Sequence, residues 1–151
     1  MRTLTGIEEL EGLVGRHLGT SDWVTVTQER IDQFADATGD HQWIHVDPDK
    51  AADGPFGTTI AHGYLTLSLL PLFYSTTYTL EGVKMGINYG ANKVRFLNPV
   101  PVDSRLRASI EVGEVKRLPD NGAQVTWHVT VELEGADKPA CYAETISVWY
   151  T

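Results

Sequence analysis

The chain has 151 residues, of which 42% are hydrophobic and 21% charged, and this composition predicts one globular domain over residues 1–151. The formal net charge of −8 argues against nucleic acid and against an anionic membrane as partners. A single cysteine, Cys141, cannot form an internal disulfide, and the N-terminal stretch lacks the long apolar run of a signal peptide. Both features favour a cytoplasmic protein.

The first predicted elements are a short strand and a helix. The strand is expected over Asp22–Val26, and Thr27 is a suitable N-cap for the helix that follows. Apolar residues recur at helical spacing after Thr27, and Gly39 stands where a helix commonly ends in a left-handed residue. We therefore expect a loop over Asp40–Pro55, just past the helix terminus.

No charged side chain occurs between Gly54 and Leu80. Glycine, proline and many Ser and Thr residues interrupt this stretch, so a buried helix is a better interpretation than a membrane span. We expect a helix over Ala61–Tyr78 that is apolar on most sides and therefore buried on all sides. Pro71 should kink it, because the proline ring opposes the carbonyl four residues earlier.

The second half of the chain alternates between apolar and polar residues over residues 105–112 and 123–133. That period is typical of half-buried antiparallel strands. The stretch LPDNGAQ supplies an Asn-Gly turn between them and EGADKP a second turn, so the strands should form a meander. A buried helix with long antiparallel strands predicts an α+β fold, in which the sheet curls around the helix.

Asp40 and His45 form a candidate catalytic pair within the stretch ATGDHQWIHVDP. An acid and an imidazole brought together by a loop can hold one water and tune each other's protonation. The structural alternatives are a turn-capping role for Asp40 and a satisfied core position for His45. A metal site built from His41, His45, Asp47 and His62 is another alternative, but the spacing matches no compact signature, and we expect no metal ion.

The stretch TTIAHGYL places His62 and Gly63 in the first turn of the expected buried helix. The first N–H groups of a helix have no internal partner and carry partial positive charge. Because glycine lacks a Cβ, a ligand oxygen can approach the Gly63 N–H closely, which makes it a candidate oxyanion donor. The alternative is a glycine required only for close packing of the helix on the sheet.

Basic residues are concentrated between Lys84 and Arg117, where seven basic and three acidic residues give +4 in a chain that is −8 overall. One interpretation is a solvated strand face. The other is a local patch for a phosphorylated ligand, for which the favoured residues are Lys93, Arg95, Arg105 and Arg107.

Two motifs in order carry a family resemblance. FADATGDHQWIHVDPDKA followed by GPFGTTIAHGYLTLSLL resembles the MaoC-like dehydratases, which include the (R)-specific enoyl-CoA hydratases, and INYGANKVRFLNPVPVDSRLR is similar to the nodulation-protein-N-like branch. The resemblance implies a hotdog fold, in which an antiparallel sheet wraps a long central helix, and a homodimer whose two sheets join. By position it implies that Asp40 and His45 are catalytic and that the Gly63 N–H is the oxyanion donor.

The resemblance also implies a function, the reversible hydration of trans-2-enoyl-CoA to (3R)-3-hydroxyacyl-CoA in fatty acid metabolism. Coenzyme A or acyl carrier protein would carry the acyl group, with no further cofactor. One alternative is a hotdog acyl-CoA thioesterase, which usually has a carboxylate on its central helix, whereas Ala61–Tyr78 contains none. Another is a non-catalytic acyl-thioester-binding subunit, against which the presence of Asp40 and His45 argues. The expected substrate-binding residues are Ile60, Ala61, His62, Gly86, Ile87, Asn88, Tyr89, Lys93 and Arg95.

Overall fold

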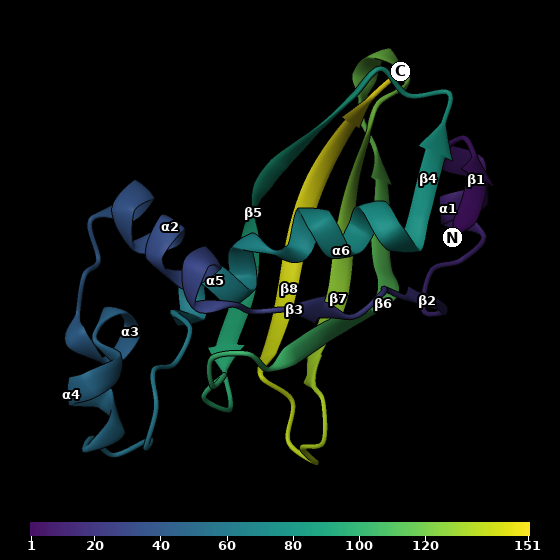
Figure 1. Cartoon of the computed structure of the whole chain (residues 1–151). Helices are drawn as coiled ribbons and strands as arrows, with labels where there is room; N and C mark the ends of the chain where they lie inside the picture. The colour runs from purple at the N-terminus through teal and green to yellow at the C-terminus, as the bar shows by residue number, and fades with distance from the viewer.

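A computed structural model describes residues 1–151, and its main feature is a six-stranded antiparallel sheet (Figure 1). The strands of this sheet are β2 (His17–Thr20), β3 (Val24–Thr25), β5 (Met85–Phe96), β6 (Arg105–Arg117), β7 (Ala123–Leu133) and β8 (Cys141–Tyr150). Their order is β2-β6-β7-β8-β5, and β3 also pairs with β6. The predicted meander is therefore confirmed, with β6, β7 and β8 adjacent.

The alternation read from the sequence places one face of the sheet in the core. Along β6 and β7 the inward side chains are fully buried, as at Ile110, Val125 and Val129, each 0% exposed. Complete burial of one such side chain stabilises the fold by about 1.5–3 kcal/mol. Because this stabilisation is repeated along β6 and β7, the burial of the inward side chains fixes the register of the two strands.

The strand expected over Asp22–Val26 is shorter in the structure, where only Val24–Thr25 pair with β6. Ser21 explains the interruption between β2 and β3. Its Oγ accepts a hydrogen bond from the Ala108 N–H at 2.8 Å, in place of a main-chain acceptor on a continuous strand.

The turn between β6 and β7 is confirmed, but its centre differs from the Asn-Gly expectation. The left-handed residues are Asp120 (φ 64°) and Asn121 (φ 60°), whereas Gly122 is extended with φ −73°. A Cβ on Gly122 would lie 2.8 Å from the Trp149 carbonyl oxygen, so glycine is needed there for the close approach of a neighbouring backbone.

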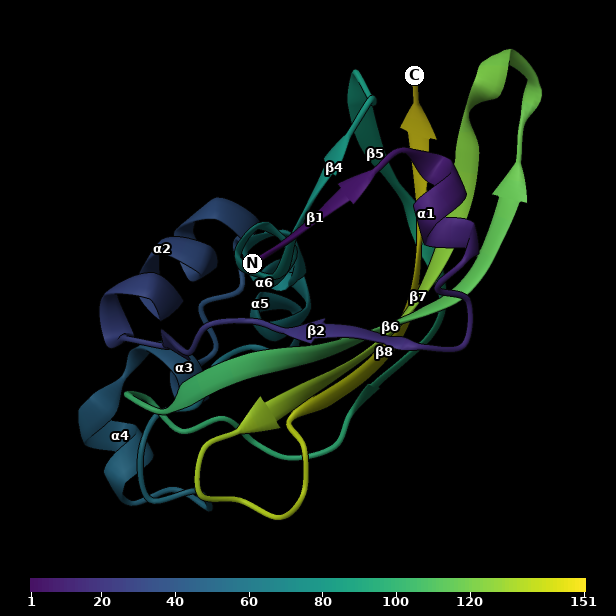
Figure 2. The same cartoon turned by 90° about the vertical axis from the view of Figure 1, so that its right-hand side faces the viewer.

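Two consecutive helices, α5 (Gly63–Ser68) and α6 (Leu70–Thr77), cross the concave face of the sheet. In Figure 2 they are seen nearly end-on, with the sheet curving around one side of them. The single helix predicted over Ala61–Tyr78 is thus divided at Leu69. Pro71 lies in the first turn of α6, where its missing N–H is tolerated, so the break falls just before it.

The prediction that this helix is buried on all sides is wrong for the single chain. Phe73 is fully buried, but Tyr64 is 68% and Leu72 38% exposed. The sheet covers only one side of α5 and α6, which leaves uncovered a strip of helix in which Tyr64, Pro71 and Leu72 are exposed along with two serines. None of the helices has both the length and the apolar character required to cross a membrane.

β5 is an edge strand that pairs only with β8. Its exposed apolar side chains are those of Met85, Ile87, Tyr89 and Phe96, which together are named the β5 apolar band. A long strand with an unpaired edge and exposed apolar residues is a template for pairing with another chain.

The remaining elements are α1 (Ile7–Glu11), α2 (Gln28–Thr38), α3 (Trp43–Val46), α4 (Pro48–Ala52) and a parallel pair, β1 (Arg2–Thr5) with β4 (Tyr78–Glu81). The predicted caps of α2 are confirmed: the Thr27 side chain accepts from the Arg30 N–H, and Gly39 is left-handed at φ 80°. The loop predicted over Asp40–Pro55 is wrong, since it contains α3 and α4. Asp47 caps α4 by accepting from the Lys50 N–H.

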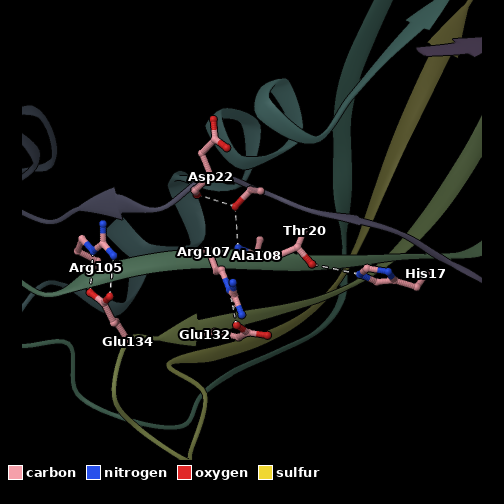
Figure 3. A network of polar contacts seen from close by, with 9 residues as sticks. His17, Thr20, Asp22, Arg105, Arg107, Ala108, Glu132 and Glu134 are labelled. Atoms are coloured by element: carbon pink, nitrogen blue, oxygen red, sulfur yellow. Dashed lines mark hydrogen bonds and ion pairs between the residues drawn. The ribbon is translucent and has the colours of Figure 1, made fainter. Parts of the chain in front are cut away.

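Two of the basic residues favoured for phosphate binding are already paired (Figure 3). Arg105 makes two 2.6 Å hydrogen bonds to Glu134, and Arg107 makes one of 2.6 Å to Glu132. Both guanidinium groups also lie over the Trp23 ring, at 5.4 and 4.5 Å from its centroid. This pairing favours the structural interpretation of these two arginines.

Candidate active site

Asp40, His45 and His62 come together although they belong to different segments. The left-handed Gly39, whose N–H donates to the Ala35 carbonyl at 2.8 Å, ends α2 and directs the chain into Asp40. His45 lies in α3, and His62 immediately precedes α5. One polar atom of each side chain lies within 4.8 Å of the others. A separation of that size can be bridged by a single water molecule.

His45 is buried, at 7% exposure, and presents one free ring nitrogen. Its Nδ1–H donates to the Ile60 carbonyl at 2.7 Å, which fixes the tautomer and leaves a lone pair on Nε2. Burial lowers the pKa of His45, and the adjacent His62 lowers it further, while the Ile60 bond and Asp40 act in the opposite direction. His45 is therefore a neutral hydrogen-bond acceptor at physiological pH.

Gln28, in the first turn of α2, ties the His45 segment to the chain before α5. Its Nε2 donates to the His45 carbonyl at 2.7 Å, and its Oε1 accepts from the Thr59 hydroxyl at 2.5 Å. A backbone bond from the Ile60 N–H to the Ile44 carbonyl (3.0 Å) lies alongside. Sequence analysis missed Gln28, because nothing in its local sequence marks a residue whose partners are 17 and 31 positions away.

Asp40 is exposed, in contrast to the two histidines. Its Oδ1 accepts from the Gln42 N–H at 3.3 Å, a local turn of the kind the structural alternative predicted. That bond occupies one lone pair of a carboxylate that has about four acceptor positions. The turn-capping role and a role as proton acceptor are therefore compatible.

Gly63 is required for close packing, and its N–H is also available for the predicted role as oxyanion donor. A Cβ at this position would lie 2.7 Å from the Phe96 ring, so close packing against β5 requires glycine. Leu65 and Thr66 are the first residues of α5 whose N–H groups reach a backbone carbonyl, that of His62, so the Gly63 N–H is free. The residue also lines a cavity of about 250 Å³ together with the predicted Ile60 and Ala61.

The predicted binding residues of β5 line the space between that strand and α6. Asn88 borders two adjacent cavities of about 500 and 310 Å³; Tyr89 lines the larger, and Gly86 the smaller. Ile87 also lines the smaller one. Tyr74, which the sequence analysis did not single out, lies between the two cavities and bonds the Thr145 hydroxyl at 2.8 Å.

Lys93 and Arg95 lie nearer the end of β5 that contacts Gly63 through Phe96. The Lys93 ammonium lies 5.5 Å from the Tyr142 ring centroid, and Arg95 donates to the Val94 carbonyl. Neither forms an ion pair with a carboxylate. Their positive charges are thus available, unlike those of the arginines on β6.

The four residues weighed as metal ligands do not come together. His41 bonds Asp36 at 2.8 Å on the surface, and Asp47 caps α4. Asp40 stands with His45 and His62 instead, but the two imidazole rings are stacked, with centroids 3.9 Å apart and planes at 25°. One nitrogen of each ring is already bonded to a main-chain carbonyl, so each histidine has a single nitrogen left for a water molecule or an ion.

Comparison with known proteins identifies the family of the chain. The family model described as the MaoC like domain matches residues 9–134. The 3-hydroxyacyl-thioester dehydratase Z of Mycobacterium tuberculosis is 58% identical over 97% of both chains, and Nodulation protein N of Rhizobium meliloti is 43% identical over 94% of this chain and 89% of the relative.

Solved structures with the same fold include two at 26% identity. The Monoamine oxidase regulatory protein from Archaeoglobus fulgius has a TM-score of 0.78, covering 100% of this chain and 99% of the other. The R-hydratase PhaJ1 from Pseudomonas aeruginosa has a TM-score of 0.69, with coverage of 91% and 81%. A sheet curled around a central helix and a family match over most of the chain lead to one assignment: the chain belongs to the MaoC-like dehydratase family and is a hydro-lyase of the hotdog fold.

Proposed function

We propose that the protein catalyses the reversible hydration of a trans-2-enoyl thioester to the (3R)-3-hydroxyacyl thioester. The observation that supports the proposal is that polar atoms of the Asp40, His45 and His62 side chains lie within 4.8 Å of one another, and that His62 directly precedes Gly63, whose N–H has no backbone partner. The name of the Mycobacterium tuberculosis relative supports a 3-hydroxyacyl thioester as substrate, and the R-hydratase title of the Pseudomonas aeruginosa neighbour supports the (3R) product.

In the hydration direction, Asp40 and His45 hold one water against the β-carbon. Asp40 accepts a proton from the water as its oxygen forms a bond to that carbon. The electron pair of the double bond moves toward the thioester carbonyl, whose developing negative charge is stabilised by the Gly63 N–H. The proton is then delivered to the α-carbon and the carbonyl re-forms, so that one water has added across one double bond. A positioned general base typically contributes about 10²–10⁴-fold to the rate.

Coenzyme A is proposed as the acyl carrier, with fatty acid metabolism in the cytoplasm as the setting. The unpaired Lys93 and Arg95 support it, because the nucleotide end of coenzyme A carries phosphate groups. The Asn88 side chain, which borders the cavities between β5 and α6, offers hydrogen-bonding groups to the amide-rich arm between nucleotide and thioester.

A homodimer is proposed as the working form. The β5 apolar band and the uncovered strip of α5 and α6 lie on neighbouring elements, since cavities between them are lined by both. Pairing of β5 with the same strand of a second copy would satisfy its edge and cover this surface. Light scattering on the purified protein tests the proposal, and Ile87→Glu should shift the mass toward that of one chain.

The activity test is an assay with crotonyl-CoA and longer enoyl-CoA substrates, following the ultraviolet absorbance of the conjugated thioester and the configuration of the product. Asp40→Asn and His45→Gln should each lose at least about 10²-fold in activity with the fold intact. Asp36→Asn and His41→Gln, which change the same residue types in an exposed ion pair nearby, serve as controls and should retain activity.

Two results would contradict the proposal. One is the absence of hydration by the unaltered protein; the other is a folded Asp40 or His45 variant with nearly full activity. Release of free coenzyme A thiol from a saturated acyl-CoA, measured in the same samples, would favour the thioesterase alternative.

A further inference from the structure

His62 is a buried polar residue to which the hydration scheme assigns no step. Its side chain is only 2% exposed, and its ring lies between Phe34, at 4.9 Å between centroids, and His45, at 3.9 Å. The Nε2–H donates to the main-chain carbonyl of Asp40 at 3.0 Å, so Nδ1 carries the lone pair. That Nδ1 is buried and has no hydrogen-bond partner.

The unpartnered Nδ1 shows that packing alone does not explain a histidine here. A buried acceptor without a donor is unfavourable, and a phenylalanine would fill the space between Phe34 and His45 without that penalty. A phenylalanine could not, however, donate a hydrogen bond to Asp40. The bond to the Asp40 carbonyl is thus the feature of this ring that only a polar side chain supplies.

Asp40 has few other restraints. It makes no hydrogen bond between its own main chain and the main chain of another residue, and its side chain accepts only the 3.3 Å bond from Gln42. The His62 side chain therefore provides the tie between the Asp40 backbone and the start of α5, while its ring face supports His45. One buried side chain contacts both residues of the catalytic pair.

We propose that His62 is a positioning residue that holds the Asp40 main chain and the His45 ring as one unit at the start of α5. The inference rests on the proposed hydratase function. It adds a residue that contacts Asp40 and His45 and not the substrate. Displacement of a catalytic group by about 1 Å can cost 10²-fold in rate, so loss of the His62 contacts should lower kcat more than it changes KM.

His62 also influences the titration of His45. The titratable groups that face His45 are Asp40 and His62, and the Ile60 carbonyl accepts from its ring. Burial is the largest cause of the lowered pKa of His45, and His62 adds to it. Removing the His62 imidazole removes one lowering contribution, so the pKa of His45 should rise and the acid limb of the kcat/KM profile should move to higher pH.

Two substitutions separate the parts of this role. His62→Phe keeps a ring against His45 but cannot donate to the Asp40 carbonyl, so kcat should fall about 10–100-fold. His62→Gln keeps an amide donor at similar reach, so it should retain more of kcat than His62→Phe. His62→Gln, which removes the titratable ring and keeps a polar side chain, should move the acid limb upward. Phe34→Leu disturbs packing on the other side of the ring and should lower stability without moving the pH profile.

A substrate-free measurement accompanies the kinetics: the imidazole signal of His45 is titrated by NMR in the unaltered protein and in each folded variant. A folded His62→Phe or His62→Gln protein with kcat within twofold of the unaltered protein and an unmoved His45 titration overturns the inference. An unmoved pH profile with losses no larger than those of Phe34→Leu also overturns it, since that is the signature of packing alone. Absence of hydration by the unaltered protein overturns the proposed function instead, and the NMR titration then decides the inference separately.

Discussion

Replacement of Gly63 by alanine tests why the first residue of α5 is a glycine. An added Cβ would lie 2.7 Å from Cδ2, 2.8 Å from Cγ and 3.0 Å from Cε2 of Phe96. Carbon atoms in contact are normally about 3.5–4.0 Å apart, so the helix and β5 must separate by roughly 1 Å. The ring can move away only by a change of the Phe96 side-chain rotamer, because Cγ is one bond from the Phe96 Cβ, and such a change would disturb its edge-to-face contact with Tyr64 (5.6 Å between centroids).

The expected cost follows from this overlap. Inserting a methyl group into a packed contact costs about 1–3 kcal/mol, so urea unfolding should show a loss of stability in that range. Alanine retains the N–H of residue 63 but shifts its position. A displacement near 1 Å should lower kcat for crotonyl-CoA by about 10²-fold, measured as the initial rate of loss of enoyl absorbance.

Phe96→Ala supplies the matched background, because it removes the ring that the new methyl group meets. Gly63→Ala combined with Phe96→Ala should recover part of the lost activity and stability, with a coupling of about 1–2 kcal/mol. Full stability and full kcat in Gly63→Ala alone would refute the packing argument. Strict additivity of the two substitutions would refute it as well.

Three further predictions use groups elsewhere in the site. Neutralising Lys93 and Arg95 together should raise KM for enoyl-CoA more than it lowers kcat, and the effect should shrink with added salt; an unchanged KM at low salt would make the pair a solvated strand face. Activity should survive exhaustive EDTA treatment, and elemental analysis should find no stoichiometric zinc or iron; loss of activity that zinc restores would contradict this. Because the pKa of His45 is lowered in the folded protein, the unfolded chain binds more protons as the pH falls below about 6.5, and this group should then destabilise the fold. Stability measured between pH 7 and pH 5 should decline less in His45→Gln than in the unaltered protein, and an identical decline would show that His45 is not responsible.

Local signals in the sequence predicted local structure well. Thr27 and Gly39 were recognised as the ends of α2, because a cap and a left-handed terminus depend on the residue itself. α3 and α4 were missed, since helices of four and five residues are too short to show a hydrophobic period. The helix expected to be buried on all sides is exposed at Tyr64. The prediction failed because the sequence pattern indicates an apolar helix surface but does not show which element covers it.

The same distinction applies to the site. The sequence predicts that Asp40 and His45 belong to one candidate site, because two family motifs in order contain them. In the structure, polar atoms of the two side chains lie within 4.8 Å of each other, a distance that one water can bridge. The role of Gln28 could not be predicted, since it depends on hydrogen bonds to residues that are distant in the sequence. Whether the Arg105 guanidinium is paired likewise depends on the β6–β7 register, which brings the Glu134 carboxylate within 2.6 Å of it.

The attachment of α3 and α4 through Gln28 has a consequence for the heat tolerance of the protein. α3 and α4 lie away from the sheet (Figure 1), and their only buried residues are His45 and Ala51. Segments with few buried contacts open at a smaller free energy than the whole fold, and amide hydrogens within them exchange sooner. On warming, the segment of α3 and α4, which carries His45, should open while the sheet stays intact. The two Gln28 hydrogen bonds, with the Ile60–Ile44 and His45–Ile60 bonds beside them, oppose this opening, and activity should be lost at a lower temperature than that at which the core melts.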